Sequence, residues 1–205
     1  MQYLQKAGIS PYIVVYRTSQ MSEKKRSPKL ISVGENQQVI KTYDFNDPDC
    51  VQILQLLQPD LLIYAGGLNI LHASLLTTAR LGCLGGHYGF LPTIRGMATV
   101  EWSVIYDIEP TVAIQRMKPG VDTGDIIMQQ AVPLKKNDNF KSIKKRSYEI
   151  TKKMLVQCAK KLLEDNSIGT TQNLAKGKQY YRMHPWVRAI AKKKLADLLA
   201  EKDTR

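Results

Sequence analysis

The 205-residue sequence lacks any long hydrophobic run. No segment approaches the roughly 18 consecutive apolar residues that a membrane-spanning helix requires, and the start of the chain has no apolar stretch of the kind found in signal peptides. Apolar residues still make up 43% of the sequence, which is enough to form the core of one ordinary domain. These absences predict a soluble, cytoplasmic protein without a membrane partner.

Cysteine is scarce as well, with three residues and no Cys-x-x-Cys pair. Cys50, Cys83 and Cys158 each have apolar neighbours in the sequence, where a thiol is a small core side chain rather than a reactive one. We therefore expect a protein of a reducing compartment, with no catalytic thiol. No structural metal site is expected either.

Acidic residues are few in the last third of the chain. Residues 1–134 contain 11 basic and 11 acidic side chains, whereas residues 135–205 contain 19 basic and 7 acidic ones, so the net charge of +12 arises there. Basic side chains at this density either bind a phosphate backbone or form the solvated side of an amphipathic helix. Residues 135–205 contain few aromatic residues and no nucleic-acid-binding motif, which favours the interpretation as a solvated helix face. Polyanionic substrates stay open as the alternative.

Short aliphatic runs, separated by helix-length segments, occupy the first 134 residues. Three of them predict strands, at 12–16, 61–65 and 81–84. Strands that are apolar on both faces and alternate with helices indicate a parallel sheet that is covered on both sides. The sequence therefore predicts an α/β fold, with an open, mostly parallel, Rossmann-like sheet and helices on both faces.

The remaining elements complete this prediction. Helices are expected from Asp47-Pro48-Asp49 to just before Pro59, and at 71–80, 99–106, 140–165 and 185–201. Residues 17–34 predict a long exposed loop, and residues 111–117 and 125–132 predict two antiparallel edge strands joined by a turn at 120–124. Because the chain opens on a short helix ending at Gly8, the usual first strand of such a fold appears missing or trimmed. We expect an α/β domain at 1–165 and a basic helical extension at 166–205.

Two glycine-rich turns supply groups that can move protons. His87 follows the strand near 81–86, and ligands of open α/β sheets bind outside the carboxyl ends of the strands. Asp122 lies in the turn between Gly120 and Gly124, where a carboxylate can orient a histidine or hold a water molecule. Taken alone, a single histidine and a short turn are more often structural than catalytic, so both interpretations stay open at this point.

The wider pattern resembles the folate-dependent formyltransferase family, which includes methionyl-tRNA, glycinamide ribonucleotide and nucleotide-sugar N-formyltransferases. The matching stretches are 60–71, Gly86-His87 through Leu91-Pro92 and Arg95-Gly96, Glu101-Trp102, and 120–127. They occur in family order and at family-like separations, and the resemblance covers about residues 8 to 165.

The resemblance implies transfer of a formyl group from 10-formyltetrahydrofolate to a primary amine through a tetrahedral intermediate. It implies that His87 stabilises the developing charge and aids proton transfer, while Asp122 holds that histidine and a proton-relaying water. It also implies a slot for the pterin ring, lined by Leu68, Ile70, Leu71, Met117 and Val121.

One position departs from the family pattern. The family's usual asparagine, two positions before the histidine, is Gly85 here. Loss of one oxyanion donor costs about 10²–10³ in rate. Either Asn69 or a backbone N–H replaces it, or the protein is a catalytically weak or inactive folate-binding module, which is the alternative function.

The acceptor is not identified by these residues. The basic last third favours a small anionic amine. A tRNA acceptor is less favoured, because a tRNA-acting member of the family would add a separate C-terminal barrel domain. An uncovered sheet edge would also allow a homodimer.

Overall fold

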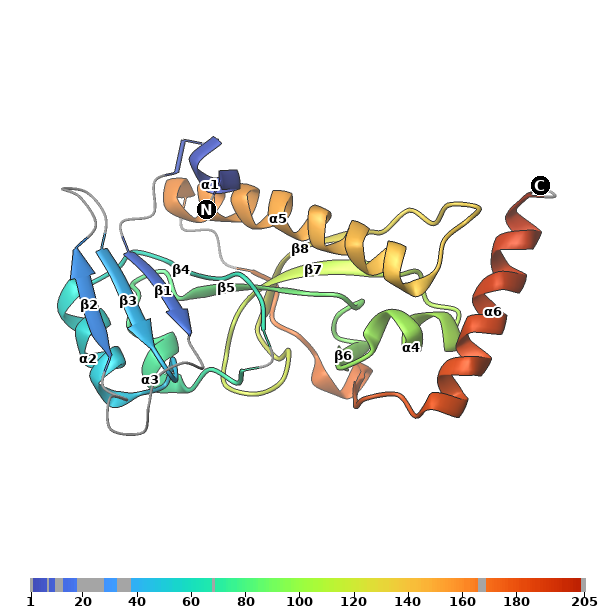
Figure 1. The fold of residues 1–205 in the computed structure, drawn as a ribbon, viewed down its shortest axis with the longest axis horizontal. Coiled ribbons are helices and arrows are strands. Elements are labelled where there is room, and N and C mark those ends of the chain that lie inside the picture. The colour runs from blue at the N-terminus through green and yellow to red at the C-terminus, as the bar shows by residue number, and fades with distance from the viewer. Residues whose placement is uncertain are drawn as a thin grey trace. The chain divides into compact units, whose positions relative to one another are not determined.

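The computed structural model describes residues 2–6, 8–9, 13–17, 28–32, 38–67, 69–165 and 169–203. The chain forms two compact units, one of Met1–Leu62 with Leu68–Cys83 and one of Ile63–Gly67 with Leu84–Arg205 (Figure 1). Within the described ranges, no helix is long and apolar enough to span a membrane. The same ranges contain no group of three or more His, Cys, Asp and Glu side chains that could hold a metal ion.

The first unit carries a three-stranded sheet in the order β1-β3-β2, in which β1 runs parallel and β2 antiparallel to β3. Its elements are α1 (Gln2–Lys6), β1 (Ile13–Arg17), β2 (Lys29–Ser32), β3 (Gln38–Thr42), α2 (Pro48–Leu57) and α3 (Ala73–Leu76). Helix α2 begins as predicted, because Asp47 Oδ1 accepts a hydrogen bond from the Asp49 backbone N–H at 2.9 Å. It ends before Pro59, also as predicted.

The second unit contains most of a four-stranded sheet in the order β4-β5-β7-β8, where β7 runs antiparallel to both β5 and β8. A separate parallel pair joins β6 to β9. The elements are β4 (Leu62–Tyr64), β5 (Cys83–His87), β6 (Ile94–Gly96), α4 (Thr99–Ile105), β7 (Thr111–Arg116), β8 (Asp125–Ala131), α5 (Phe140–Asp165), a 3-10 helix (Leu174–Lys176), β9 (Lys178–Tyr180) and α6 (Pro185–Asp203).

Helix α5 packs on strands β7 and β8 of the sheet (Figure 1). Its buried face includes Ile143, Ser147, Met154, Cys158 and Leu162. The helix approaches β5 so closely that a Cβ on Gly86 would lie 2.4 Å from Thr151 Cγ2. Glycine at this position therefore lets the helix lie against the strand that carries His87.

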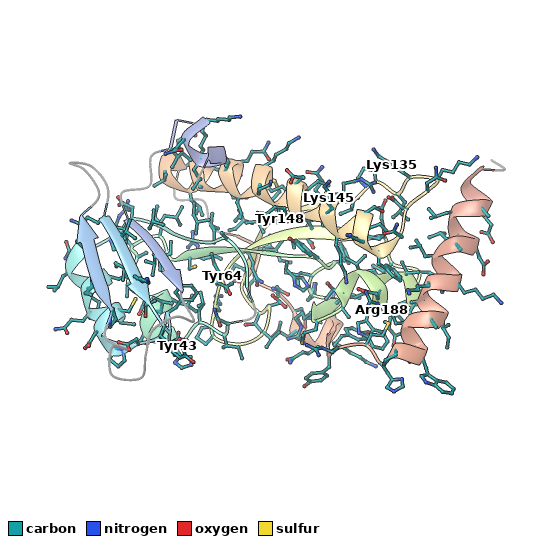
Figure 2. All side chains as sticks on the ribbon, viewed as in Figure 1. Tyr43, Tyr64, Lys135, Lys145, Tyr148 and Arg188 are labelled. Atoms are coloured by element: carbon teal, nitrogen blue, oxygen red, sulfur yellow. The ribbon has the colours of Figure 1, made fainter. Side chains whose placement is uncertain are left out.

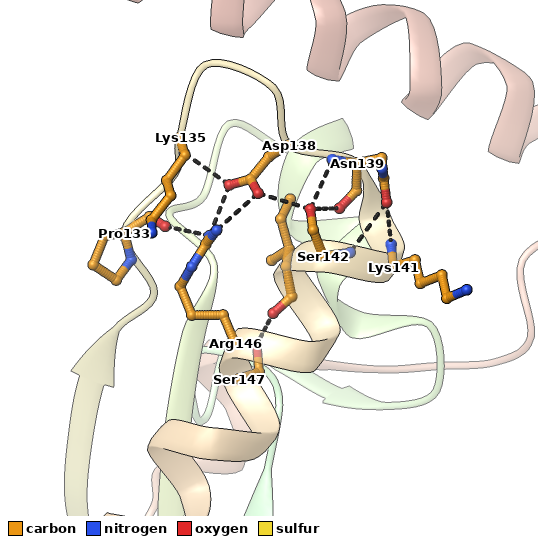
Figure 3. A network of polar contacts seen from close by, with 9 residues as sticks. Pro133, Lys135, Asp138, Asn139, Lys141, Ser142, Arg146 and Ser147 are labelled. Carbon is orange, nitrogen blue, oxygen red and sulfur yellow. Dashed lines mark hydrogen bonds and ion pairs between the residues drawn. The ribbon is translucent and has the colours of Figure 1, made fainter.

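The start of α5 is held by a polar network (Figure 3). Asn139 Oδ1 accepts hydrogen bonds from the backbone N–H groups of Lys141 and Ser142, at 2.9 and 3.1 Å. Asp138 forms a two-pronged ion pair with Arg146, at 2.7 and 2.8 Å, and its side chain is only 3% exposed. The first turn of α5 is thus capped and cross-linked by side chains from its own sequence.

Some basic residues of the last third, of which Figure 2 labels Lys135, Lys145 and Arg188, form ion pairs and others are exposed. The carboxylate of Glu101, buried in α4, accepts contacts from Lys144 Nζ of α5 at 2.5 Å and from Arg188 Nη2 of α6 at 3.3 Å. Lys145 of α5 is exposed. Lys144 and Arg188 therefore tie α5 and α6 to α4, whereas Lys145 lies on the solvated face of α5.

The α/β fold class is confirmed, with α5 at 140–165 and α6 from residue 185 as predicted. Two local predictions were wrong. The helix expected at 71–80 is α3, only Ala73–Leu76, because the hydroxyls of Thr77 and Thr78 donate to the carbonyls of Ala73 and Leu75 as the chain turns. The loop expected at 17–34 includes β2 at Lys29–Ser32, and most of its other residues lie outside the described ranges.

Candidate active site

His87 is the last residue of β5, at the carboxyl end of a strand that is buried almost throughout. Its backbone pairs with Ala113 of β7, and its side chain is 6% exposed. The imidazole is therefore a buried group fixed by the central sheet, at the kind of strand end where open α/β sheets bind ligands.

Both ring nitrogens of His87 face oxygen atoms. Nδ1 lies 3.2 Å from Asp122 Oδ2, and Nε2 lies 2.8 Å from the Ile94 carbonyl oxygen. A carbonyl and a carboxylate only accept hydrogen bonds, so a neutral ring can satisfy one of them and a doubly protonated ring satisfies both. The ring is thus held between two acceptor oxygens, one on each side.

The Asp122 carboxylate is held on both of its oxygens. Oδ2 accepts a hydrogen bond from the Gly96 backbone N–H at 2.9 Å, and Oδ1 accepts one from Gln115 Nε2 at 3.0 Å. The backbone of Asp122 has a φ of 53°, in the left-handed region that non-glycine residues seldom adopt. Several bonds are therefore needed to keep this turn in its conformation.

Gln115 supports the turn twice. Besides its bond to Asp122, its Oε1 accepts the Gly124 backbone N–H at 2.9 Å. A register shift in the pairing of β7 with β8 falls between Ile114 and Gln115, and such irregularities re-aim side chains near active sites. Gly124 must be glycine, because a Cβ there would lie 2.1 Å from the Arg116 carbonyl oxygen.

A neighbouring carboxylate, Asp125, is already committed to other partners. Lys118 Nζ lies 2.7 Å from its Oδ1, and Thr171 Oγ1 donates to the same oxygen at 3.0 Å. Burial raises the pKa of Asp125, but these hydrogen bonds and the positive charges of Lys118 and Arg116 outweigh it, and the net pKa is lowered. Asp125 stays ionised and structural, while Asp122 faces the imidazole.

Gly85 has a methionine side chain directly over it. A Cβ on Gly85 would lie 2.5 Å from Met117 Sδ and 2.9 Å from Met117 Cγ. The space that a larger residue 85 would enter is therefore filled by the flexible thioether of Met117. An asparagine at position 85, as in the family pattern, would occupy the same space as the Met117 side chain.

The residues predicted to line the pterin slot are distributed over both units. Met117 and Val121 lie between β7 and β8, in the same connection as Asp122. Ile70, which is 60% exposed, and Leu71, which is buried, belong to the first unit. Leu68 lies outside the described residues. The second unit by itself thus brings together His87, Asp122, Met117 and Val121.

The sequence analysis did not identify the two glutamines that hold the turn of Asp122. Gln115 is one of them, and Gln172 is the other, since its Nε2 donates to the carbonyl oxygens of Asp122 and Gly124 at 3.0 and 2.6 Å. A single glutamine in a strand or a loop adds no periodic pattern to the sequence. Gln172 also lies 50 residues beyond Asp122, so its position in the chain does not indicate the contact. Only the folded chain shows their roles in the turn.

Comparison with known proteins agrees with the resemblance seen in the sequence. A family model described as formyl transferase matches residues 12–159. The chain belongs to the formyltransferase family.

It is 32% identical over 137 residues to the methionyl-tRNA formyltransferase of Syntrophus aciditrophicus, covering 66% of this chain and 44% of that protein. It is 33% identical over 125 residues to the enzyme of the same name from Synechococcus sp. strain CC9311, covering 60% and 36%. The chain thus spans less than half the length of these relatives.

Solved formyltransferase structures share the fold. Phosphoribosylglycinamide formyltransferase from Bacillus halodurans aligns with a TM-score of 0.61 at 19% identity, over 80% of this chain and 88% of that one. A formyltransferase from Anoxybacillus kamchatkensis, in complex with UDP-4,6-dideoxy-4-formamido-L-AltNAc and tetrahydrofolate, aligns with a TM-score of 0.59 at 23% identity, over 70% and 74%. At these identities the likeness concerns the fold.

Proposed function

We propose that this formyltransferase-family protein transfers a formyl group from 10-formyltetrahydrofolate to a primary amine. The observation that carries the proposal is the contact of His87 Nδ1 with Asp122 Oδ2, at 3.2 Å, at the carboxyl end of β5. Membership of the family supports formyl transfer, and the bound tetrahydrofolate of the Anoxybacillus structure supports a folate donor.

The residues of the turn fit a folate donor in their chemistry. Met117 and Val121 supply apolar side chains in the same connection as the polar His87–Asp122 pair, and pockets for such ligands combine apolar walls with a few placed polar groups. Bound 10-formyltetrahydrofolate would supply the formyl carbon. The acceptor nitrogen would form a bond to that carbon as the bond from the carbon to the folate nitrogen breaks, and the proton lost by the acceptor amine would pass to the folate nitrogen. His87 would donate a hydrogen bond to the formyl oxygen, and Asp122 would hold the imidazole in place.

His87 must exchange one partner to act in this way. Its Nε2 pairs with the Ile94 carbonyl oxygen at 2.8 Å, so a substrate oxygen competes with that carbonyl for the ring N–H. Gly89 runs along the same edge of the ring, where a Cβ would lie 2.6 Å from Nε2. Glycine at position 89 thus allows the close passage of the chain beside the group that acts on the substrate.

A second candidate function is a folate-binding module with little turnover. Met117 over Gly85 favours it, because the site is packed without the amide that family members place there. Gly85→Asn alone must displace Met117, so we expect the double variant Gly85→Asn/Met117→Ala to raise kcat at least about tenfold if the rest of the oxyanion site is intact. No gain in kcat, with folate binding preserved, would favour the binding module.

For the acceptor we propose a small anionic amine, with tRNA as the alternative. The excess of basic side chains in residues 135–205 supports an anionic acceptor. The curated relatives are named methionyl-tRNA formyltransferases, which supports tRNA, whereas the Anoxybacillus structure holds a formamido sugar nucleotide. A panel of amines that includes a nucleotide-linked amino sugar and aminoacylated tRNA separates the two.

The test is formyl transfer from 10-formyltetrahydrofolate, followed by its absorbance, for the wild-type protein, His87→Ala and Asp122→Ala. Transfer to one amine that both substitutions abolish is the expected result. His184→Ala serves as the control, because His184 is an exposed histidine whose Nδ1 accepts the Trp186 backbone N–H at 3.3 Å. Transfer that persists in His87→Ala would overturn the proposal.

A further inference from the structure

The segment Gly169–Tyr180 lies beyond the α/β domain predicted from the sequence, yet it contacts the catalytic turn repeatedly. Thr170 and Ile126 exchange two backbone hydrogen bonds, both of 2.8 Å. Thr171 Oγ1 donates to Asp125. Gly169 packs so closely on β8 that a Cβ would lie 2.7 Å from the Ile126 carbonyl oxygen. The segment is thereby fixed against the strand that follows Asp122.

Gln172 makes the most direct contact of this segment with the turn. It is 9% exposed, and its Nε2 donates to the Asp122 carbonyl oxygen at 3.0 Å and to the Gly124 carbonyl oxygen at 2.6 Å. Both N–H bonds of the amide are therefore used on one turn. Its Oε1 is buried and has no hydrogen-bond partner in the part of the chain that the structure describes. The amide is thus placed to serve the turn by donating.

The two glutamines hold different parts of the same turn. Gln115 binds the Asp122 carboxylate and the Gly124 N–H, whereas Gln172 binds the carbonyl groups of Asp122 and Gly124. The backbone of Asp122 is in the left-handed region, which is unfavourable for a residue other than glycine. The turn therefore depends on hydrogen bonds from other segments to keep this conformation. Without Gln172, the buried Gly124 carbonyl and the part-buried Asp122 carbonyl lose this amide donor.

The same segment also supports Asp122 from its other side. Gly96, whose N–H donates to Asp122 Oδ2, pairs with Tyr180 in the β6–β9 ladder. A Cβ on Gly96 would lie 2.1 Å from the Tyr180 carbonyl oxygen, so the two strands are in close contact. Residues 169–180 therefore reach the Asp122 turn through Gln172 and the Asp122 carboxylate through Gly96.

We propose that Gln172 is a positioning residue of the formyl-transfer site, which keeps the Asp122 carboxylate against His87 Nδ1. Segment Gly169–Tyr180 is then part of the active site and not an appended extension. The inference rests on the proposed function, because it assigns Gln172 its effect through the His87–Asp122 pair.

Two near-isosteric variants test this role. Gln172→Met keeps the length of the side chain and removes the donors, while Gln172→Glu places carboxylate oxygens against two carbonyl groups. We expect kcat to fall about 30-fold in Gln172→Met, and further in Gln172→Glu, because small displacements of a reacting group are costly. The KM for the folate donor stays within about twofold. Gln130→Met is the matched control, since Gln130 is exposed on β8, and it keeps the wild-type kcat.

The pH–rate profile separates positioning from partial unfolding. Displacing the carboxylate that faces the imidazole moves the midpoint of the profile to lower pH in Gln172→Met. Loss of folded protein would only scale the profile without moving it. A fall in kcat with an unmoved midpoint and a matching loss of folded protein would overturn the proposal, as would a wild-type kcat.

Amide hydrogen exchange tests the same claim without any turnover. In Gln172→Met, the Gly96 and Gly124 amides exchange at least about tenfold faster, while buried amides of α5 keep their rates. If the wild-type protein transfers no formyl group, the proposed function fails, and the exchange data still decide whether Gln172 holds the turn. Unchanged exchange at both glycines would overturn the positioning role.

Discussion

Asp122 and Asp138 both lie in the second unit, and each is held by several hydrogen bonds, yet their partners differ in kind. Asp138 binds the Arg146 guanidinium with both oxygens and also accepts bonds from Ser142 Oγ and the Lys135 backbone N–H (Figure 3). Asp122 accepts bonds from two neutral donors, and the cation it can acquire is the imidazole of His87.

We infer that this difference separates a structural carboxylate from one that serves the proposed formyl transfer. The charge of Asp138 is always neutralised by an arginine, whose own charge does not change at any ordinary pH. The charge of Asp122 faces the Nδ1 atom of a histidine ring instead. We therefore treat the Asp122 network, which faces a histidine, as the candidate site, and the Asp138 network, which binds a permanent cation, as a stabilising cross-link.

Replacing the charge of Asp122 should have the largest effect on activity. Asp122→Asn keeps the size of the side chain and one oxygen for Gly96 N–H, but it cannot stabilise a charged imidazole. We expect kcat to fall about 10³-fold with little change in the free energy of unfolding. Steady-state kinetics and urea denaturation on the same preparation check this. Unfolding that accounts for the whole loss would place Asp122 in the structural class.

Removing Asp138 should lower the free energy of unfolding and leave kcat unchanged, which is the opposite of the result expected for Asp122. Asp138→Ala leaves Arg146 without its carboxylate partner and exposes the start of α5, so we expect a loss of about 3 kcal/mol in the free energy of unfolding. The kcat per folded molecule stays at the wild-type value. Urea denaturation gives the first quantity and active-site titration the second. A selective loss of kcat would show that the two networks are not distinct.

Acid sensitivity sharpens the comparison further. Hydrogen bonds from Arg146, opposed by burial and reinforced by Ser142 and Lys135, hold the pKa of Asp138 well below its usual range. A lowered carboxyl pKa stabilises the fold fully above the unfolded-state pKa of about 4, and this contribution is lost as pH falls through the folded-state pKa. We expect the free energy of unfolding to fall as the pH drops below about 4. The slope is smaller in Asp138→Ala, and equal slopes would contradict this assignment.

Part of the candidate site could be proposed from the sequence. His87 and Asp122 stand in motifs whose order and separations resemble one family, and α5 follows from its apolar spacing. The motifs identify the two residues, but the 3.2 Å contact between His87 Nδ1 and Asp122 Oδ2 is seen only in the structure.

The supporting residues could not be predicted, for physical reasons. The β6–β9 pair joins two three-residue strands more than 80 positions apart, and such short strands carry no alternating pattern. The Ile94 carbonyl is a backbone group, so its contact with His87 Nε2 leaves no trace in residue identity. Gln115 and Gln172 act through single amides whose value depends on where the turn lies.

The central claim is that His87 and Asp122 act as one unit in formyl transfer. A double-mutant cycle with His87→Ala, Asp122→Ala and the combined variant, read as kcat/KM for formyl transfer, tests it most directly. The account predicts that the double variant is hardly slower than His87→Ala, because removing either member disables the pair. Losses that multiply independently in the double variant, or a fully active single variant, would contradict it.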